Sequence, residues 1–410
     1  MNYNICTLPS GLRVIHLPSA SRVIYCGYAV HAGTRHELPG EEGLAHFCEH
    51  LAFKGTNRRS SVQILNAIEG VGGELNAFTG KEDTVYYAAI TRQHLPKAID
   101  VLTDIVFRSQ YPQQEVEKER EVVCDEIESY EDTPAELIFD EFENILFEGH
   151  PLGHNILGCS EQVRTYSSDD ARRFTSCHYR PDHAVFFASG DLDFKKLVKK
   201  LEGMDEGCQQ VKDEVIMRAR TSFIFKASAD VHQRQRGTHQ AHVMIGTVGY
   251  PATDPRRWAL YLLNNLLGGP SLNSRLNMAL RERRGLVYTV ESSMTCYSDT
   301  GLWSVYFGCD PDDVRRCLQL VKKELARLTD KPLSEKQLNM SKQQLRGQLT
   351  IAADNREQFS IDFARSFLHE GRVRDLDKVL ARVDCLTSEQ LQQTACELFA
   401  ADRLVTLIYT

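Results

Sequence analysis

Two histidines and a glutamate at helical spacing are the residues in this sequence best placed to do chemistry together. They are His46, Glu49 and His50, in the run His46-Phe-Cys-Glu-His50. Residues three and four apart share one face of a helix, so both imidazoles could bind one ion with Glu49 on the same side. Neutral imidazole suits zinc, and three protein ligands leave a position for water, from which Glu49 could remove a proton. The order inverts the HExxH zinc motif. Two histidines can also stand four apart by chance, so a third ligand is needed.

The third ligand is sought in a long acidic segment at residues 113–131, which we expect to be helical. Glu119 and Glu126 are separated by about two helical turns and therefore share one face. Three apolar residues sit close to that face, so part of it is buried: Val116, Val123 and Ile127. A buried carboxylate needs a cation or hydrogen bonds. Acidic helices are more often solvated, however, and the residues alone do not choose between the two glutamates.

The elements that must position these side chains occur twice in the chain. Each half has a strand, a helix, a proline and a second, long helix: residues 84–90, 94–107 and 113–131, then 301–307, 312–328 and 334–349. Upstream of each set lie a strand and a helix, at residues 25–31 and 43–53, then 243–248 and 258–267. A repeat at a spacing of roughly 220 residues indicates domain duplication rather than a solenoid.

The duplicated pattern predicts an α+β protein of two homologous domains, each a mainly antiparallel sheet packed with long helices. The segment between the halves is polar and lacks hydrophobic periodicity. We therefore predict an N-terminal metal-binding domain at residues 1–205, a linker at 206–220 and a C-terminal domain at 221–410. The C-terminal domain has no metal motif: Tyr261, Asn264 and Asn265 stand where His46, Glu49 and His50 would be.

Composition excludes several classes of function. The 410 residues carry a net charge of -8, which argues against nucleic acid as the main partner. No run of about eighteen apolar residues appears, so we expect no membrane span. The N-terminus lacks the features of a signal peptide, and we expect a cytoplasmic protein. The twelve cysteines form no CxxC pair and suggest reduced thiols. One of them, Cys48, lies inside the motif and is an alternative candidate as a nucleophile.

Longer runs around these residues resemble a known family. Gly43-Leu-Ala-His-Phe-Cys-Glu-His-Leu-Ala-Phe-Lys-Gly-Thr56 resembles the signature of the pitrilysin-type (M16) metallopeptidases, and is most similar to the mitochondrial processing peptidase β-subunit and its bacterial relatives. Glu119-Arg-Glu-Val-Val-Cys-Asp-Glu-Ile127 resembles the second block of the family, whose last glutamate is a zinc ligand. The resemblance implies the LuxS/MPP-like metallohydrolase fold and one Zn2+ per chain on His46, His50 and Glu126. It makes Glu49 the general base and gives Glu119 an orienting role.

The resemblance also implies how a peptide would bind. Gly72-Gly-Glu-Leu-Asn-Ala-Phe-Thr79 is similar to the family's sheet edge, where Asn76 and Ala77 would bind substrate as an added strand; a plain hairpin turn is the alternative. Phe53 matches an aromatic residue that lines the substrate pocket, although core packing explains it equally well. Residues 274–290 are similar to a substrate-clamping block, which assigns Arg281 and Tyr288 to the peptide and its oxyanion.

The activity implied is that of a zinc endopeptidase acting on peptides or unfolded segments inside an enclosed chamber. Two chains of this size would assemble, as a homodimer or as a heterodimer with an inactive homologue. Two alternatives stay open. The chain could be a catalytic subunit that needs a distinct inactive partner, or a non-catalytic binding or assembly protein of the same fold.

Overall fold

The chain forms two α+β units, each built around one sheet. The structure is a computed structural model that describes residues 2–205 and 229–410, so the predicted linker at 206–220 lies outside the described residues. One unit comprises residues 1–129, 154–221 and 353–374, and the other comprises 130–153, 222–352 and 375–410. Two segments, 130–153 and 353–374, therefore pack with the opposite half of the sequence.

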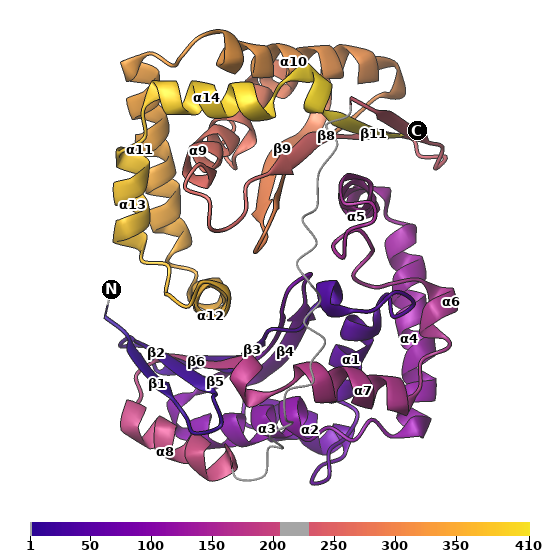
Figure 1. Ribbon diagram of the computed structural model, residues 1–410, viewed down its shortest axis with the longest axis vertical. Helices are drawn as coiled ribbons and strands as arrows, with labels where there is room; N and C mark the ends of the chain where they lie inside the picture. Colours follow the sequence, from indigo (N-terminus) through magenta and orange to yellow (C-terminus); the bar gives the residue numbers. More distant parts are fainter. Residues whose placement is uncertain (1, 206–228) are drawn as a thin grey trace. The chain divides into compact units, whose positions relative to one another are not determined.

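The first sheet has six strands in the order β1-β2-β6-β3-β5-β4 (Figure 1). Their bounds are Asn4–Thr7 (β1), Arg13–Pro18 (β2), Val23–Val30 (β3), Glu74–Thr79 (β4), Thr84–Thr91 (β5) and Ala184–Gly190 (β6). Neighbouring strands are antiparallel except for β2 and β6. Strand β4 forms one edge of this sheet.

The second sheet has five strands in the order β7-β11-β8-β10-β9. Their bounds are Val231–Arg234 (β7), Ala241–Gly249 (β8), Val287–Cys296 (β9), Gly301–Cys309 (β10) and Val405–Tyr409 (β11). Strands β7 and β11 are parallel, and the other neighbours are antiparallel. The order β2-β6-β3-β5-β4 of the first sheet thus recurs, with its one parallel pair in the same place. The predicted fold class of two similar, mainly antiparallel α+β halves is confirmed.

Long helices flank both sheets. Those of the first half are α1 (Leu44–Ala52), α2 (Ser61–Glu69), α3 (Leu95–Phe107), α4 (Gln113–Glu131), α5 (Pro134–Leu146), α6 (Ser160–Val163), α7 (Ser168–His178) and α8 (Phe194–Asp205). Those of the second half are α9 (Arg257–Gly268), a π-helical segment η4 (Asn277–Glu282), α10 (Val314–Asp330), α11 (Glu335–Ala352), α12 (Arg356–Glu370), α13 (Leu376–Asp384) and α14 (Ser388–Leu398). Short turns η1 (Thr34–His36), η2 (Arg92–His94), η3 (Pro181–His183), η5 (Pro311–Asp313) and η6 (Ala401–Arg403) complete the described elements.

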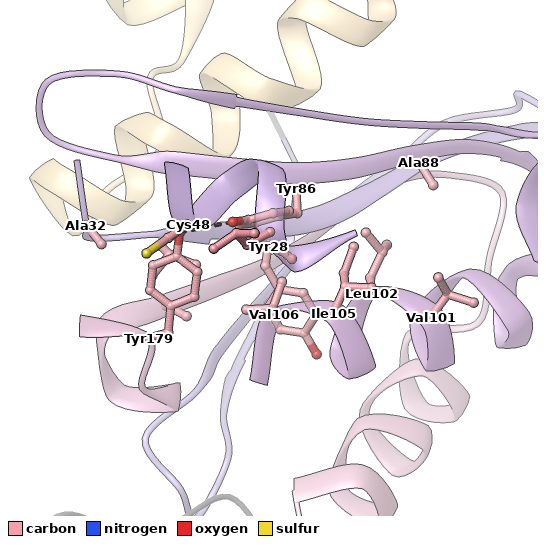
Figure 2. Packing of buried hydrophobic residues seen from close by; sticks show 14 of the residues in the cluster. Tyr28, Ala32, Cys48, Tyr86, Ala88, Val101, Leu102, Ile105, Val106 and Tyr179 are labelled. Atoms are coloured by element: carbon pink, nitrogen blue, oxygen red, sulfur yellow. Dashed lines mark hydrogen bonds between the residues drawn. The ribbon is translucent and has the colours of Figure 1, made fainter. Parts of the chain in front are cut away.

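Helices cover both faces of each sheet. Successive side chains of a strand point to opposite faces. On β5, Tyr86 joins the core that α1 and α3 share, while Val85 and Tyr87 join a second core with α12. Figure 2 shows the first of these cores, where Tyr28 and Tyr86 lie beside the apolar side chains of α3. In the second unit, the exchanged helix α5 covers one sheet face in the same way. This explains why β5 and β10 are apolar without alternation.

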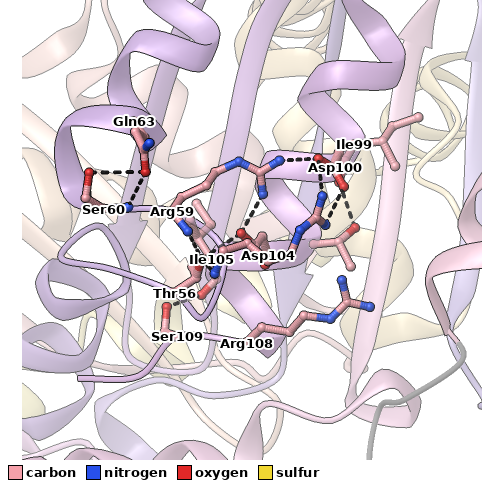
Figure 3. Close-up of polar contacts among 12 residues, drawn as sticks. Thr56, Arg59, Ser60, Gln63, Ile99, Asp100, Asp104, Ile105, Arg108 and Ser109 are labelled. Atoms are coloured by element: carbon pink, nitrogen blue, oxygen red, sulfur yellow. Dashed lines mark hydrogen bonds and ion pairs between the residues drawn. The ribbon is translucent and has the colours of Figure 1, made fainter. Parts of the chain in front are cut away.

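Polar contacts to α3 hold the segment that follows α1 in place. Thr56 donates its hydroxyl to Asp104 at 2.7 Å, and Arg59 makes an ion pair with the same carboxylate at 2.5 Å (Figure 3). Arg59 also pairs with Asp100. Because Asp104 is fully buried, these contacts satisfy a carboxylate that would otherwise be costly to bury. They fix the exit of α1, the helix that carries the histidine motif.

A group of partly buried imidazoles lies at the end of β3. The ring centroids of His31 and His36 are 4.8 Å apart, and those of His36 and His178 are 5.5 Å apart. Burial, reinforced by the neighbouring histidines, lowers the pKa of His36 to about 3 and that of His31 to about 4. Burial also lowers the pKa of His178 to about 4. These side chains are therefore neutral in the folded protein at pH values where the unfolded chain binds protons.

We predict that acid destabilises this protein in the window between about pH 6.5 and pH 4. A lowered folded-state pKa means that the unfolded state binds more protons there, so the free energy of unfolding falls as pH falls. At pH 5 the lowered pKa of His36 reduces the free energy of unfolding by about 2 kcal/mol. His36→Asn should lose less thermal stability than the unsubstituted chain between pH 7.5 and pH 5, as measured by its unfolding midpoint. His239→Asn, at an exposed position, is the matched control. Equal pH dependence in all three proteins would contradict the prediction.

Candidate metal centre

Helix α1 begins at a position fixed by a glycine and a buried carboxylate. Gly43 has φ 91°, and a Cβ there would lie 2.5 Å from the Leu157 carbonyl oxygen. Glu37 accepts hydrogen bonds from the backbone N–H groups of Gly43 at 3.1 Å and Ala45 at 2.7 Å. These are among the N–H groups at a helix start that have no partner within the helix. The rotation of α1 about its axis is thereby set, and with it the direction of the motif side chains.

Three of the side chains singled out in the sequence meet in space. One possible ligand atom from each of His46, His50 and Glu126 lies within 4.8 Å of the other two. Glu126 reaches across from α4: its carboxylate lies 3.3 Å from His50 Nε2 and 3.9 Å from His46 Nε2. Across residues 2–205 and 229–410, no other group of three or more His, Cys, Asp or Glu side chains converges in this way. Two separate helices therefore supply one compact set of nitrogen and oxygen donors.

The negative charges around His50 favour the binding of a cation. Burial lowers the pKa of His50, but the carboxylates of Glu119 and Glu126 outweigh burial and raise it to about 9. The pKa of His46 falls to about 4 because of burial and the neighbouring His50. A hydrogen bond from His50 holds the pKa of Glu126 below its ordinary value. The site thus stabilises positive charge between its carboxylates, and two imidazoles with one carboxylate are a donor set that suits zinc.

Glu49 lies on the same face of α1 and is only 8% exposed. Burial raises the pKa of its carboxyl group, and nearby Glu126 adds to the rise. The hydroxyl of Thr79, at the end of β4, donates to Glu49 Oε2 at 2.6 Å and opposes that shift. This contact holds one oxygen of Glu49. A carboxylate with a raised pKa is suited to accept and return a proton.

Glu119 contacts the opposite nitrogen of His50. Its Oε1 lies 2.9 Å from His50 Nδ1, and its Oε2 lies 2.6 Å from Lys54 Nζ. Burial raises the pKa of Glu119, but the hydrogen bonds from His50 and Lys54 outweigh burial and keep it below its usual range. The structure therefore separates the two glutamates of α4: Glu126 lies with the Nε2 atoms, and Glu119 lies behind His50.

Lys54 and Thr79 have no role predicted from the sequence, although Lys54 contacts Glu119 and Thr79 contacts Glu49. Lys54 follows His50 by four residues, so its position on the same side of the chain was a usable signal. Nothing local connects Thr79 with Glu49, because the contact depends on how β4 packs against α1.

The residues proposed to bind peptide on this side lie on or beside β4. Asn76 is exposed and faces Tyr87 across the β4–β5 ladder, and Ala77 faces Tyr86. The Asn76 side-chain oxygen accepts a hydrogen bond from the Ala77 N–H at 2.9 Å. Phe53, half-buried at the end of α1, packs on the core with its ring centroid 6.1 Å from that of Tyr86. Their roles toward a substrate stay predictions.

Arg281 and Tyr288 lie together in the second unit. Arg281 belongs to the π-helical segment η4, and its guanidinium lies 5.6 Å from the centre of the Tyr288 ring. Tyr288, near the start of β9, is 80% exposed. Such an exposed aromatic residue beside a cation is available to contact a ligand. Their predicted action on a peptide stays a prediction.

Cys48 points away from the ligand set. The side chain is fully buried in the core between α1 and Tyr179, and its Sγ lies 3.9 Å from the Ala171 carbonyl oxygen (Figure 2). Burial and neighbouring carboxylates raise the pKa of this thiol well above its ordinary value. Because the thiolate is the reactive form, this arrangement disfavours Cys48 as a nucleophile.

Helix α9 of the second half carries Tyr261, Asn264 and Asn265 in place of metal ligands. Asn264 accepts a hydrogen bond from the Ser292 hydroxyl at 2.5 Å.

Among the described residues, no helix is long and apolar enough to cross a membrane.

Two family models match consecutive regions of the chain. Residues 14–160 match the model described as Insulinase (Peptidase family M16), and residues 165–345 match the model described as the Peptidase M16 inactive domain. The matched order agrees with the distribution of the candidate metal ligands, since His46, His50 and Glu126 all lie in the first region.

Individual relatives extend the similarity over the full length. The chain is 36% identical to a protein of Streptomyces coelicolor named as an uncharacterized zinc protease, over 95% of this chain and 85% of that protein. It is 32% identical to the uncharacterized zinc protease YmxG of Bacillus subtilis, over 98% and 97%. The fold is shared with a protease from Helicobacter pylori, with a TM-score of 0.91 at 20% identity, covering 100% of this chain and 99% of that one.

Proposed function

Because the chain belongs to peptidase family M16, we propose that it is a zinc-dependent endopeptidase that hydrolyses peptides or unfolded segments. The observation that carries the proposal is the convergence of His46, His50 and Glu126 from two helices, with Glu49 on the same face of α1. Relatives that match over nearly all of this chain are named zinc proteases. The donor set and its surplus negative charge support zinc as the resident ion.

In the proposed chemistry, His46, His50 and Glu126 would hold the ion. A zinc ion supplies Lewis-acid chemistry, which polarises a peptide carbonyl and makes water more acidic. Glu49 removes a proton from the attacking water, and its raised pKa favours that transfer. The hydroxide attacks the carbonyl carbon, the C–N bond breaks, and Glu49 returns the proton to the leaving amine. The hydroxyl of Thr79 keeps one Glu49 oxygen in place while the other handles the proton.

The free edge of β4 supports a peptide substrate. An extended peptide can add to such an edge through backbone hydrogen bonds, which demand little of its sequence. Asn76 would release the Ala77 N–H to a substrate carbonyl, and Phe53 would contact a substrate side chain. Arg281 and Tyr288 would also bind the peptide, with the Tyr288 hydroxyl donating to the oxyanion.

We also propose that two chains assemble around an enclosed chamber, as a homodimer. A heterodimer with an inactive homologue is the alternative assembly, and it would give the same enclosure. Size-exclusion chromatography with light scattering shows whether the purified chain forms a dimer by itself, and peptidase activity of the purified chain alone would exclude the need for a distinct partner.

Metal removal tests the proposed function. We expect the purified chain to cleave an internally quenched, unstructured peptide, to lose that activity after dialysis against a chelator, and to recover it on addition of zinc. Elemental analysis before and after dialysis should show about one zinc per chain lost and regained. A chain that binds zinc but cleaves none of a diverse peptide set would instead support a binding protein of the same fold. Activity that persists without metal would overturn the assignment.

A further inference from the structure

We propose that Lys54 is a positioning residue for the metal centre: it holds Glu119, which in turn holds His50 with Nε2 directed to the ion. This inference rests on the proposed zinc function. It adds a residue whose side chain touches neither ligand nitrogen nor substrate, and it predicts a measurable effect on zinc affinity.

The contacts form one continuous chain. Lys54 Nζ lies 2.6 Å from Glu119 Oε2, and Glu119 Oε1 lies 2.9 Å from His50 Nδ1. On the other side of the ring, His50 Nε2 faces Glu126 at 3.3 Å. An imidazole whose Nδ1–H donates to a carboxylate keeps its Nε2 lone pair free for a metal. Both oxygens of Glu119 are occupied, so its carboxylate has one orientation, and that orientation selects the tautomer of His50.

The two candidate histidine ligands differ in this respect. His46 Nδ1 is buried and finds no hydrogen-bond partner in the described part of the chain. His46 is thus oriented by packing around α1. His50, which is more exposed than His46, relies on the contact from Glu119. Loss of that contact should therefore change mainly the orientation of His50 and leave that of His46 unchanged.

The charge of Lys54 is as important as its hydrogen bond. The Glu119 side chain is 5% exposed, so its negative charge has little solvation of its own. A buried carboxylate left with one partner turns toward another donor. That change weakens the hydrogen bond that orients His50. Lys54 is 26% exposed, which leaves room for substitutions that do not disturb the core.

Lys54 could alternatively serve only to end α1. Its backbone N–H donates to the Leu51 carbonyl oxygen at 3.1 Å, and a cation near a helix C-terminus is favourable. If Lys54 has only that structural role, its substitution should lower stability and leave zinc affinity unchanged. If Lys54 is a positioning residue, its substitution should lower zinc affinity and leave stability unchanged. The two are separable by experiment.

The test is the zinc affinity of variants, measured by competition with a chromophoric chelator at fixed pH. Lys54→Met should weaken zinc binding about 10- to 100-fold, the range typical of residues that support a ligand from behind. Lys54→Arg, which keeps the charge and donors, should recover most of the affinity. Lys118→Met is the matched control, since Lys118 is an exposed lysine of α4 paired with Glu115. It should bind zinc as the unsubstituted chain does.

A double-mutant comparison shows whether Lys54 acts through Glu119. If it does, Lys54→Met in a Glu119→Gln background should weaken zinc binding little beyond Glu119→Gln alone. Full additivity, or an unchanged affinity of Lys54→Met, would overturn the inference. The Glu119→Gln background also serves if Lys54→Met alone folds poorly, because removing the carboxylate charge removes the need for the lysine. A chain that bound no zinc at this site in any form would instead refute the proposed function.

Discussion

Glu49→Gln is expected to abolish peptide hydrolysis while zinc stays bound. The substitution is isosteric, and the side-chain oxygen of glutamine can still accept the hydrogen bond that Thr79 donates at 2.6 Å. The amide cannot accept a proton from water, so the rate should fall by about 10²- to 10⁴-fold. None of the three proposed ligands is altered. Stability should change little, because a buried carboxyl group is replaced by a neutral group of the same shape.

The measurement pairs turnover of a quenched peptide with zinc content of the same sample. Glu69→Gln, at the exposed end of α2, is the matched control and should behave as the unsubstituted chain. Undiminished turnover by Glu49→Gln would remove Glu49 as the base. Loss of zinc together with activity would instead make Glu49 a ligand, although Glu49 is not among the three convergent side chains.

Local sequence patterns were sufficient to predict the two helices that carry the site. The helix expected at residues 43–53 is α1, Leu44–Ala52, and the one at 113–131 is α4, Gln113–Glu131. Both follow from spacing within a few turns, where side chains three or four apart must share a face. The duplicated order of strands and helices was also visible, and the two sheets share one strand order.

Long-range packing was not accessible from those patterns. Nothing in residues 134–146 or 356–370 distinguishes a helix that covers its own sheet from one that covers the other, and both α5 and α12 are exchanged. One consequence is visible only in three dimensions: Asp83, the residue before β5, pairs with Arg365 of α12 at 2.5 Å. The contact of Thr79 with Glu49 was hidden for the same reason.

The choice between Glu119 and Glu126 came from family resemblance, since helical periodicity puts both on one face. The geometry supplies a physical reason for that choice. Lys54 and His50 Nδ1 already occupy both oxygens of Glu119, whereas Glu126 lies beside both Nε2 atoms. The two glutamates should therefore differ in what their removal does.

Glu126→Ala is expected to remove zinc from the site and activity with it. The two imidazoles that remain are too few for a stable zinc site, which uses three protein ligands when it is catalytic. The loss of affinity should exceed that of Glu119→Gln, for which about 10- to 100-fold is typical of an orienting partner. The fold should persist, because the Glu126 side chain is 44% exposed and stabilises no core contact. Competition with a chelator gives the affinities, and circular dichroism gives the stability.

Glu121→Ala, on the exposed face of the same helix, controls for general effects on α4 and should keep zinc. The order of the three variants in zinc affinity is more informative than the affinity of any single variant. If Glu126 binds the ion and Glu119 orients His50, zinc affinity must fall most for Glu126→Ala, less for Glu119→Gln and not at all for Glu121→Ala. A reversed order of the first two would mean that the carboxylate behind His50 is the ligand. The peptide-hydrolysing mechanism would then have to be rebuilt around a different open position on the ion.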